Sequence, residues 1–118
     1  MRPLLAPQHP QLREARTTLI DVMSNLGQVC QWLHDFDAAL ALKREALELA
    51  RQSGELLTAA SRLADIGEVL GLMERFGEAR AALREAIGQF RDLGAPTQES
   101  AAHTLLNSLP GPSEFDGI

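Results

Sequence analysis

The sequence predicts an all-α protein, an antiparallel helix-pair solenoid of two units followed by a C-terminal capping helix, five helices in total. Alanine and leucine dominate the 118 residues while aromatic residues make up only 4%, a bias that favours helix over sheet. Apolar residues recur at spacings of three and four, the period of an amphipathic helix. The chain also repeats itself after forty residues, as stacked helical units do.

The internal repeat is visible when the chain is shifted by forty positions. Eleven of the 37 positions from 18 to 54 then carry identical residues, against roughly two or three expected by chance at ordinary composition. The identical pairs are Thr18/Thr58, Gly27/Gly67, Val29/Val69, Phe36/Phe76, Ala39/Ala79, Ala41/Ala81, Arg44/Arg84, Glu45/Glu85, Ala46/Ala86, Arg51/Arg91 and Gly54/Gly94. One structural unit is therefore expected twice.

The first unit, residues 11–54, is predicted as two helices, from about Pro10 to His34 and from about Asp37 to Gln52. Proline suits the first helical turn, and Gly54 suits a left-handed stop at the end of the second helix. The apolar faces of the two helices are Leu12, Ala15, Leu19, Met23, Leu26 and Cys30, and then Ala39, Leu40, Leu42, Ala46, Leu47 and Leu49.

The rest of the chain follows the same register. The second unit, residues 55–94, is predicted as helices over about 55–74 and 78–93, with Gly94 as the stop. The capping-helix segment, residues 95–110, begins at Ala95-Pro96 and is helical to about Leu109, and it corresponds to the first helix of a third unit. Residues 1–10 are interpreted as an N-terminal extension and 111–118 as a flexible tail.

Composition excludes several classes of function. A net charge of −5 disfavours nucleic-acid binding, because phosphate contacts need a basic surface. The single cysteine, Cys30, excludes an internal disulfide and is expected to be a small core residue. Neither a membrane-spanning run nor a signal peptide is visible, so a cytoplasmic protein with no membrane partner is expected.

No pattern indicates catalysis or a cofactor. The sequence has no glycine-rich phosphate loop and no nucleophile motif, so we expect a protein that is not an enzyme and has no cofactor. His34, Asp35 and Asp37 bring possible metal ligands together, but a second ligand cluster at useful spacing is missing. A turn with a helix-capping aspartate explains the same residues more simply.

The repeated motif resembles the tetratricopeptide repeat, in the long forty-residue spacing of kinesin-light-chain-like and many bacterial members. The matching residues are Asn25-Leu26-Gly27, Cys30, Phe36, Ala39 and Ala46, and again Asp65-Ile66-Gly67, Leu70, Phe76, Ala79 and Ala86. The small residues are expected to let helices approach closely, and the phenylalanines to fill the space near each turn. Met23 and Leu63 replace the motif's usual tryptophan, Cys30 and Leu70 its tyrosine, and Arg51 and Arg91 its terminal proline.

The resemblance implies a module that binds a protein or peptide in a concave groove lined by the first helices of successive units. The expected groove residues are Asp21, Ser24, Asn25, Gln28, Gln31, Trp32, Ser61, Ala64, Asp65, Glu68, Gly71, Leu72 and Thr104. Asn25 and Asp65 stand where related repeats hold a peptide backbone. The alternative is that these positions are merely solvated helix faces.

Two details narrow the expected ligand. Positions that clamp a C-terminal carboxylate in chaperone-binding relatives carry Ser24, Gln28, Ala64 and Glu68 here, so that ligand class is disfavoured. Trp32 is either an exposed anchor for a partner or a cover over the turn beside Phe36, and packing is the favoured reading.

Self-association is the competing function, because a solenoid unit buries its faces only against neighbours. The terminal helices are expected to leave apolar side chains for a second copy or a partner, and the candidates are Leu12, Leu19, Leu105, Leu106 and Leu109. A homodimer, a structural assembly unit and a fragment of a larger regulator all remain open readings.

Overall fold

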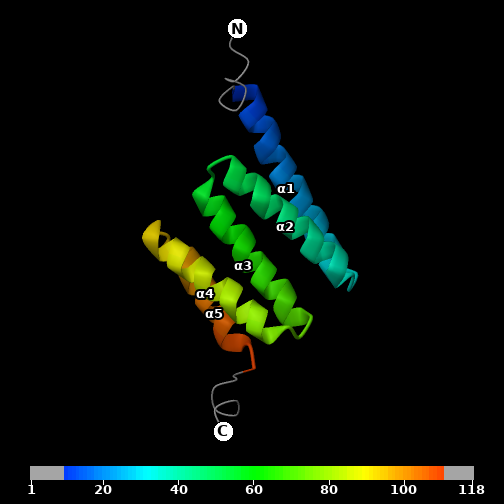
Figure 1. Ribbon diagram of the computed structural model, residues 1–118, viewed down its shortest axis with the longest axis vertical. Coiled ribbons are helices and arrows are strands. Elements are labelled where there is room, and N and C mark those ends of the chain that lie inside the picture. The colour runs from blue at the N-terminus through cyan, green and yellow to red at the C-terminus, as the bar shows by residue number, and fades with distance from the viewer. Residues whose placement is uncertain (1–9, 111–118) are drawn as a thin grey trace.

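The computed structural model describes residues 10–110, which form five α-helices and no strand within that range (Figure 1). The helices are α1 (Pro10–Trp32), α2 (Phe36–Gln52), α3 (Leu56–Leu72), α4 (Phe76–Asp92) and α5 (Pro96–Ser108). The all-α prediction is confirmed, and each expected helix end lies within two residues of the observed one. The expected flexible tail and most of the N-terminal extension lie outside the described residues.

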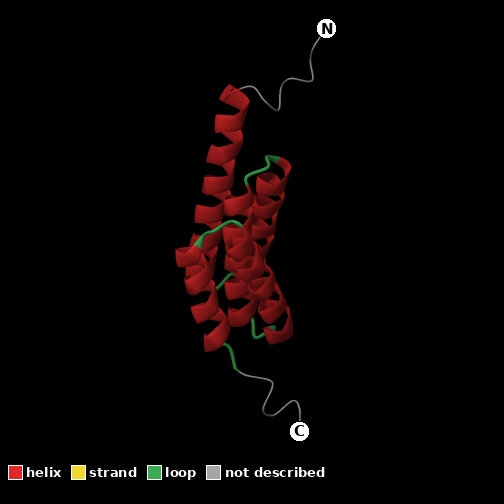
Figure 2. Cartoon of the chain, turned by 90° about the vertical axis from the view of Figure 1, so that its left-hand side faces the viewer, coloured by secondary structure: helices red, strands yellow, loops and turns green. Residues whose placement is uncertain are grey.

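Each helix packs against its neighbours in sequence, which makes the fold a solenoid of helix pairs. Contacts join α1 to α2, α2 to α3, α3 to α4 and α4 to α5, while α3 also touches α5. In Figures 1 and 2 the longest helix, α1, extends beyond the others at its N-terminal end. The second helix pair stacks on the first mainly through the contact between α2 and α3.

Small residues set the spacing between paired helices, as the sequence predicts. Ala39 and Ala79 are fully buried at the start of the second helix of each unit. A Cβ atom added to Gly67 would lie 2.7 Å from Cγ of Leu83 and 3.3 Å from the backbone oxygen of Ala79. Such a distance is shorter than van der Waals contact, so α3 and α4 approach this closely because position 67 has no side chain.

All four turns have the same hydrogen-bonding pattern. In the first, the amide of Asp35 donates to the carbonyl of Cys30, and the amide of His34 donates to that of Gln31, the pattern of a Schellman motif. The residue in the left-handed conformation is His34, Gly54, Glu74 or Gly94, with φ between 62° and 70°. The two glycine stops were expected from the sequence, but the histidine and the glutamate were not.

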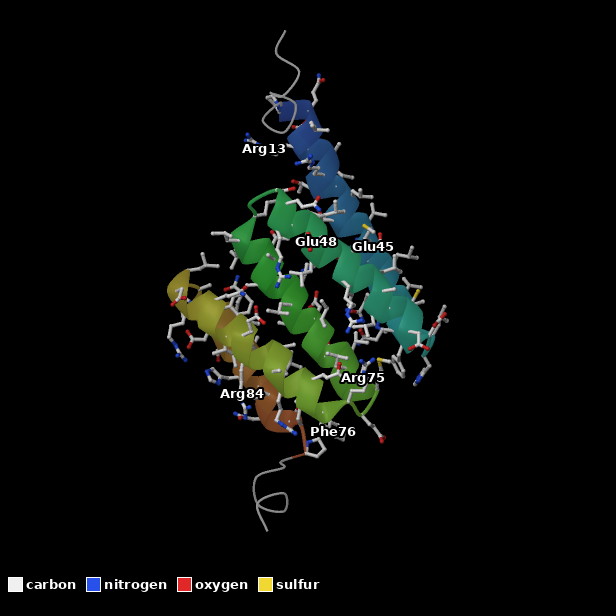
Figure 3. All side chains as sticks on the ribbon, in the orientation of Figure 1. Arg13, Glu45, Glu48, Arg75, Phe76 and Arg84 are labelled. Carbon is white, nitrogen blue, oxygen red and sulfur yellow. The ribbon has the colours of Figure 1, made fainter. Side chains whose placement is uncertain are left out.

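The predicted helix cap and the outer charges are also in place. The Asp35 carboxylate accepts a hydrogen bond of 3.2 Å from the amide of Ala38 and so caps α2. Figure 3 shows Glu45 and Glu48 on α2 and Arg84 on α4, on the face turned to the viewer, and all three are exposed. This outer face is solvated and carries charges of both signs.

Candidate functional site

An open cavity of about 260 Å³ lies between α3 and α5, with the N-terminal end of α4 as its floor. Its wall is mostly apolar, and Glu68 and Ser108 add polar groups at its edge. We call it the apolar subsite, and its lining residues are Gly67, Glu68, Gly71, Leu72, Phe76, Leu83, Leu105, Ser108, Leu109 and Pro110. The first helices of successive units thus face a shared groove here.

The forty-residue repeat gives residues of this subsite counterparts in the first helix pair, on α1 and α2. Glu68, Gly71, Leu72, Phe76 and Leu83 of the apolar subsite correspond to positions forty residues earlier in the chain. Those positions carry Gln28, Gln31, Trp32, Phe36 and Lys43. Three of the five are polar or charged, so we call these positions, together with the side chains of α3 that face them, the polar subsite.

Lys43 is the buried lysine of the polar subsite, and only 2% of its surface is exposed. Its stem crosses Gly27, since a Cβ atom there would lie 3.2 Å from Cγ and 3.4 Å from Cε of the lysine. Within residues 10–110 its ammonium group makes no hydrogen bond and no ion pair. Its ammonium nitrogen is not among the fully buried side-chain atoms without a hydrogen bond, so the apolar stem is covered while the charged end keeps contact with solvent.

Asp65 and Arg62 of α3 complete the charged part of the polar subsite. Burial raises the pKa of the Asp65 carboxyl, and the nearby charges of Arg62 and Lys43 partly oppose that rise. Nε of Arg62 lies 3.2 Å from Oδ2 of Asp65, but this contact does not have the geometry of a hydrogen bond. Oε1 of Gln31 is likewise buried with no hydrogen-bond partner. The subsite therefore holds donors and acceptors that are not fully used.

The expected groove residues divide into accessible and covered ones. Ser24 and Ala64 are buried, and the Ser24 hydroxyl donates to the carbonyl of Ile20 at 2.8 Å. Neither offers a surface to a ligand. Thr104 is exposed, although its hydroxyl already donates to the carbonyl of Ser100. The remaining candidates are exposed or half-buried, namely Asp21, Asn25, Gln28, Gln31, Trp32, Ser61, Asp65, Glu68, Gly71 and Leu72.

The aromatic side chains near the first turn are not arranged as the sequence analysis expected. Trp32 is 70% exposed, so the expectation that it covers the turn beside Phe36 is wrong. The ring that contacts Phe36 is His34, in an edge-on arrangement with the ring centroids 5.4 Å apart. His34 reaches that position because its left-handed backbone turns the chain sharply after α1. Cys30 packs against the core, half-buried.

The apolar residues expected at the two ends of the solenoid are not equally exposed to solvent. Leu105, Leu106 and Leu109 of the C-terminal part are half-buried and pack against the core, and two of them line the apolar subsite. Leu19 of α1 is exposed, whereas Leu12 is half-buried. The larger uncovered apolar surface therefore belongs to α1 and not to α5.

Lys43 and Arg62 were not expected in the site: the charged segment Lys43-Arg44-Glu45 has the sequence of a solvated helix face, but Lys43 is buried. The signal was present in the repeat, where Lys43 interrupts an apolar face and corresponds to Leu83. In the described part of the chain, no group of three histidine, cysteine, aspartate or glutamate side chains is placed to hold a metal ion. None of the five described helices is long and apolar enough to cross a membrane.

Comparison with known proteins agrees with this architecture. No curated protein matches the chain. A family model for the tetratricopeptide repeat matches residues 14–92, which covers α2, α3 and α4 and most of α1. The match includes Gly27 and Gly67, where the paired helices approach closely, and Phe36 and Phe76, which follow the turns. The forty-residue repeat, the paired helices and this match together place the chain in the tetratricopeptide-repeat family.

Proposed function

We propose that the groove between α1, α3 and α5 binds an extended polypeptide segment of a partner protein. The family suggests a protein-interaction module, and its repeats are generally scaffolds without catalysis. The observation that carries the proposal is the set of buried polar groups without full partners in the polar subsite. Such groups are costly in an empty groove and become favourable when a ligand supplies the missing hydrogen bonds.

The two subsites suit different parts of one peptide. The Lys43 ammonium and the Gln31 side-chain NH₂ can donate hydrogen bonds to the carbonyl oxygens of a peptide backbone. The Asp65 carboxylate and Oε1 of Gln31 can accept hydrogen bonds from its N–H groups. The apolar subsite has the volume and the wall to hold one large aliphatic or aromatic side chain. We therefore propose a ligand with an apolar anchor next to a stretch whose backbone is bound by polar groups.

Trp32 and Asn25 are proposed to extend this surface at its edge. Trp32 occupies the position equivalent to Leu72, which lines the apolar subsite. An exposed tryptophan offers a large contact area at low conformational cost and is enriched among residues that dominate binding energy. Asn25 is exposed on the same helix and offers both a donor and an acceptor.

The test uses peptides selected from a random twelve-residue library on the immobilised chain. Their affinities are measured by fluorescence anisotropy with labelled peptide and the protein in solution. Gln28→Ala, Asn25→Ala and Lys43→Met are each expected to weaken binding at least five-fold. Glu45→Ala and Arg84→Ala, on the outer face of α2 and α4, are the matched controls and are expected to leave the affinity unchanged.

Two results would contradict the groove. The first is a selected peptide that binds the three groove variants as tightly as the original chain. The second is a loss of affinity in the outer-face controls, which would place the ligand on α2 and α4. Helix content from circular dichroism is measured for every variant, so that a loss of fold is separated from a loss of binding.

A further inference from the structure

An uninterrupted apolar stripe runs along α1 and faces away from α2. It is formed by Leu12, Ala15, Leu19, Val22, Leu26 and Val29 of α1 and by Leu33 directly after it, at spacings of three and four residues in strict alternation. The five members from Leu19 to Leu33 are large and between 41% and 73% exposed. From Val22 to Leu33 the sequence contains no charged residue at all. A surface helix of a lone module does not ordinarily expose such a face.

The equivalent face of α3 shows what kind of surface this is. Forty residues on, Leu19, Leu26 and Val29 correspond to Ala59, Ile66 and Val69, which are at most 5% exposed. All three belong to the core, and α3 packs against both α2 and α4. The stripe on α1 is thus the face on which a repeat of this family receives another helix, and within residues 10–110 nothing covers it.

We propose that a second copy of this chain covers the stripe, with its own α1 packed antiparallel against the first. Apolar residues that alternate at three and four residues have a period of 3.5, the period at which two long helices stay in contact. The α1 helix is 23 residues long, against 17 for each of the next three. A helix of that length gives two copies six turns of shared contact.

The available area is a large part of what a dimer needs. The five exposed stripe residues offer roughly 450 Å² per copy at the exposed fractions given above, and flanking atoms add to it, against about 800 Å² per partner in a stable interface. The face is largely apolar, as dimer interfaces are.

The helix dipoles favour the antiparallel arrangement. A parallel pair would align the two helix dipoles unfavourably. Arg13 and Arg16 of the first turns line a hollow with Gln52, Ser53 and Gly54 at the end of α2, so their charges lie away from the stripe and do not decide the orientation.

The experiment is sedimentation-equilibrium centrifugation of the chain from 1 µM to 1 mM. We expect the mass of a dimer at the upper concentrations and at least a ten-fold weaker association for Leu26→Glu and for Val22→Glu. Leu57→Glu on α3 is the matched control, since Leu57 has a comparable exposure of 43% outside the stripe, and it is expected to remain dimeric. The stripe side chains are exposed, so both stripe variants should keep the helix content of the original chain.

Cross-linking tests the orientation in a Cys30→Ala background. The chain with Leu19→Cys and Val29→Cys is expected to form disulfide-linked dimers under mild oxidation, whereas Leu19→Cys alone is not. A dimer linked efficiently by Leu19→Cys alone would overturn the antiparallel arrangement. A monomer at all concentrations, or an unchanged dimer in both stripe variants, would overturn the proposal. Peptide affinity in Leu26→Glu is expected to be unchanged, so this failure and a failure of the groove are distinguishable.

Discussion

The two helix pairs have the same backbone arrangement, and one of the positions at which their residues differ lies at the centre of each pair. In the second pair the side chain that crosses the glycine of the first helix is Leu83, which packs on Gly67; in the first pair it is Lys43, which packs on Gly27. Both side chains are almost completely buried. One pair therefore has an apolar floor and the other a charged one, within the same arrangement of helices.

The difference teaches that the repeat fixes where side chains lie but not what they do there. The apolar floor completes the core and leaves a cavity suited to an aliphatic group. The charged floor leaves Lys43, Gln31 and Asp65 without full partners. A ligand that spans both pairs thus contacts an apolar surface in one pair and charged and polar groups in the other. Exchanging the residues at positions 43 and 83 tests how much this difference matters.

The largest expected effect comes from transferring the charge to the second pair. Leu83→Lys buries an ammonium group between α3 and α4 and removes an aliphatic side chain that is 0% exposed. We expect it to lower the free energy of unfolding by about 3 kcal/mol or more. Urea unfolding followed by circular dichroism measures the change. A loss below about 1 kcal/mol would mean that this floor tolerates a charge as well as the first one does.

The reverse exchange is expected to stabilise the protein. Lys43→Met keeps an unbranched stem over Gly27 and removes an ammonium group that is largely covered and has no hydrogen bond among the described residues. The free energy of unfolding should rise by about 1–2 kcal/mol, net of the lost attraction to Asp65. The same urea titration measures it, and Arg44→Met, an exposed neighbour, is the control. A destabilised Lys43→Met would show that the ammonium group is better solvated than its burial indicates.

The two glycine crossings give a matched pair of smaller effects. Gly67→Ala places a Cβ atom 2.7 Å from the branched Leu83, whereas in Gly27→Ala the nearest atom is 3.2 Å away on the flexible Lys43 stem. We expect Gly67→Ala to cost about 1–2 kcal/mol. Gly27→Ala should stay within about 0.5 kcal/mol, because the gain in helix propensity offsets the slight crowding. Thermal unfolding of the two variants side by side decides this, and equal losses would contradict it.

The smallest effect is a titration. Burial raises the pKa of Asp65 while Arg62 and Lys43 lower it, so Lys43→Met should raise it further, as carboxyl carbon NMR can measure. A pKa raised on folding adds stability that is complete below the unfolded value and is lost as pH rises through the folded value. Stability should therefore fall with rising pH in this range, more in Lys43→Met than in the original chain, and Asp65→Asn should flatten the profile.

The helices could be predicted from sequence because their determinants are local. The spacing of apolar residues, Gly54, Gly94 and the cap at Asp35 each act within a few residues. The polar subsite could not be predicted in the same way. The burial of Lys43 depends on Gly27 in another helix, and that pairing follows only from the packed structure. The exposure of Trp32 likewise depends on which side of α1 faces its neighbours. The long-spacing subtype stays a prediction.

The four turns have a further consequence for how such a chain can change in length. Their left-handed residues lie at 34, 54, 74 and 94, so the backbone passes through the same joint every twenty residues. The joint permits insertion of a single helix as readily as of a pair. A twenty-residue insertion, however, would move every later helix to the other kind of position. Helices that line the groove would then take the places of outer helices. Viable changes in length are thus multiples of forty, enforced by the surfaces of the helices and not by their connections.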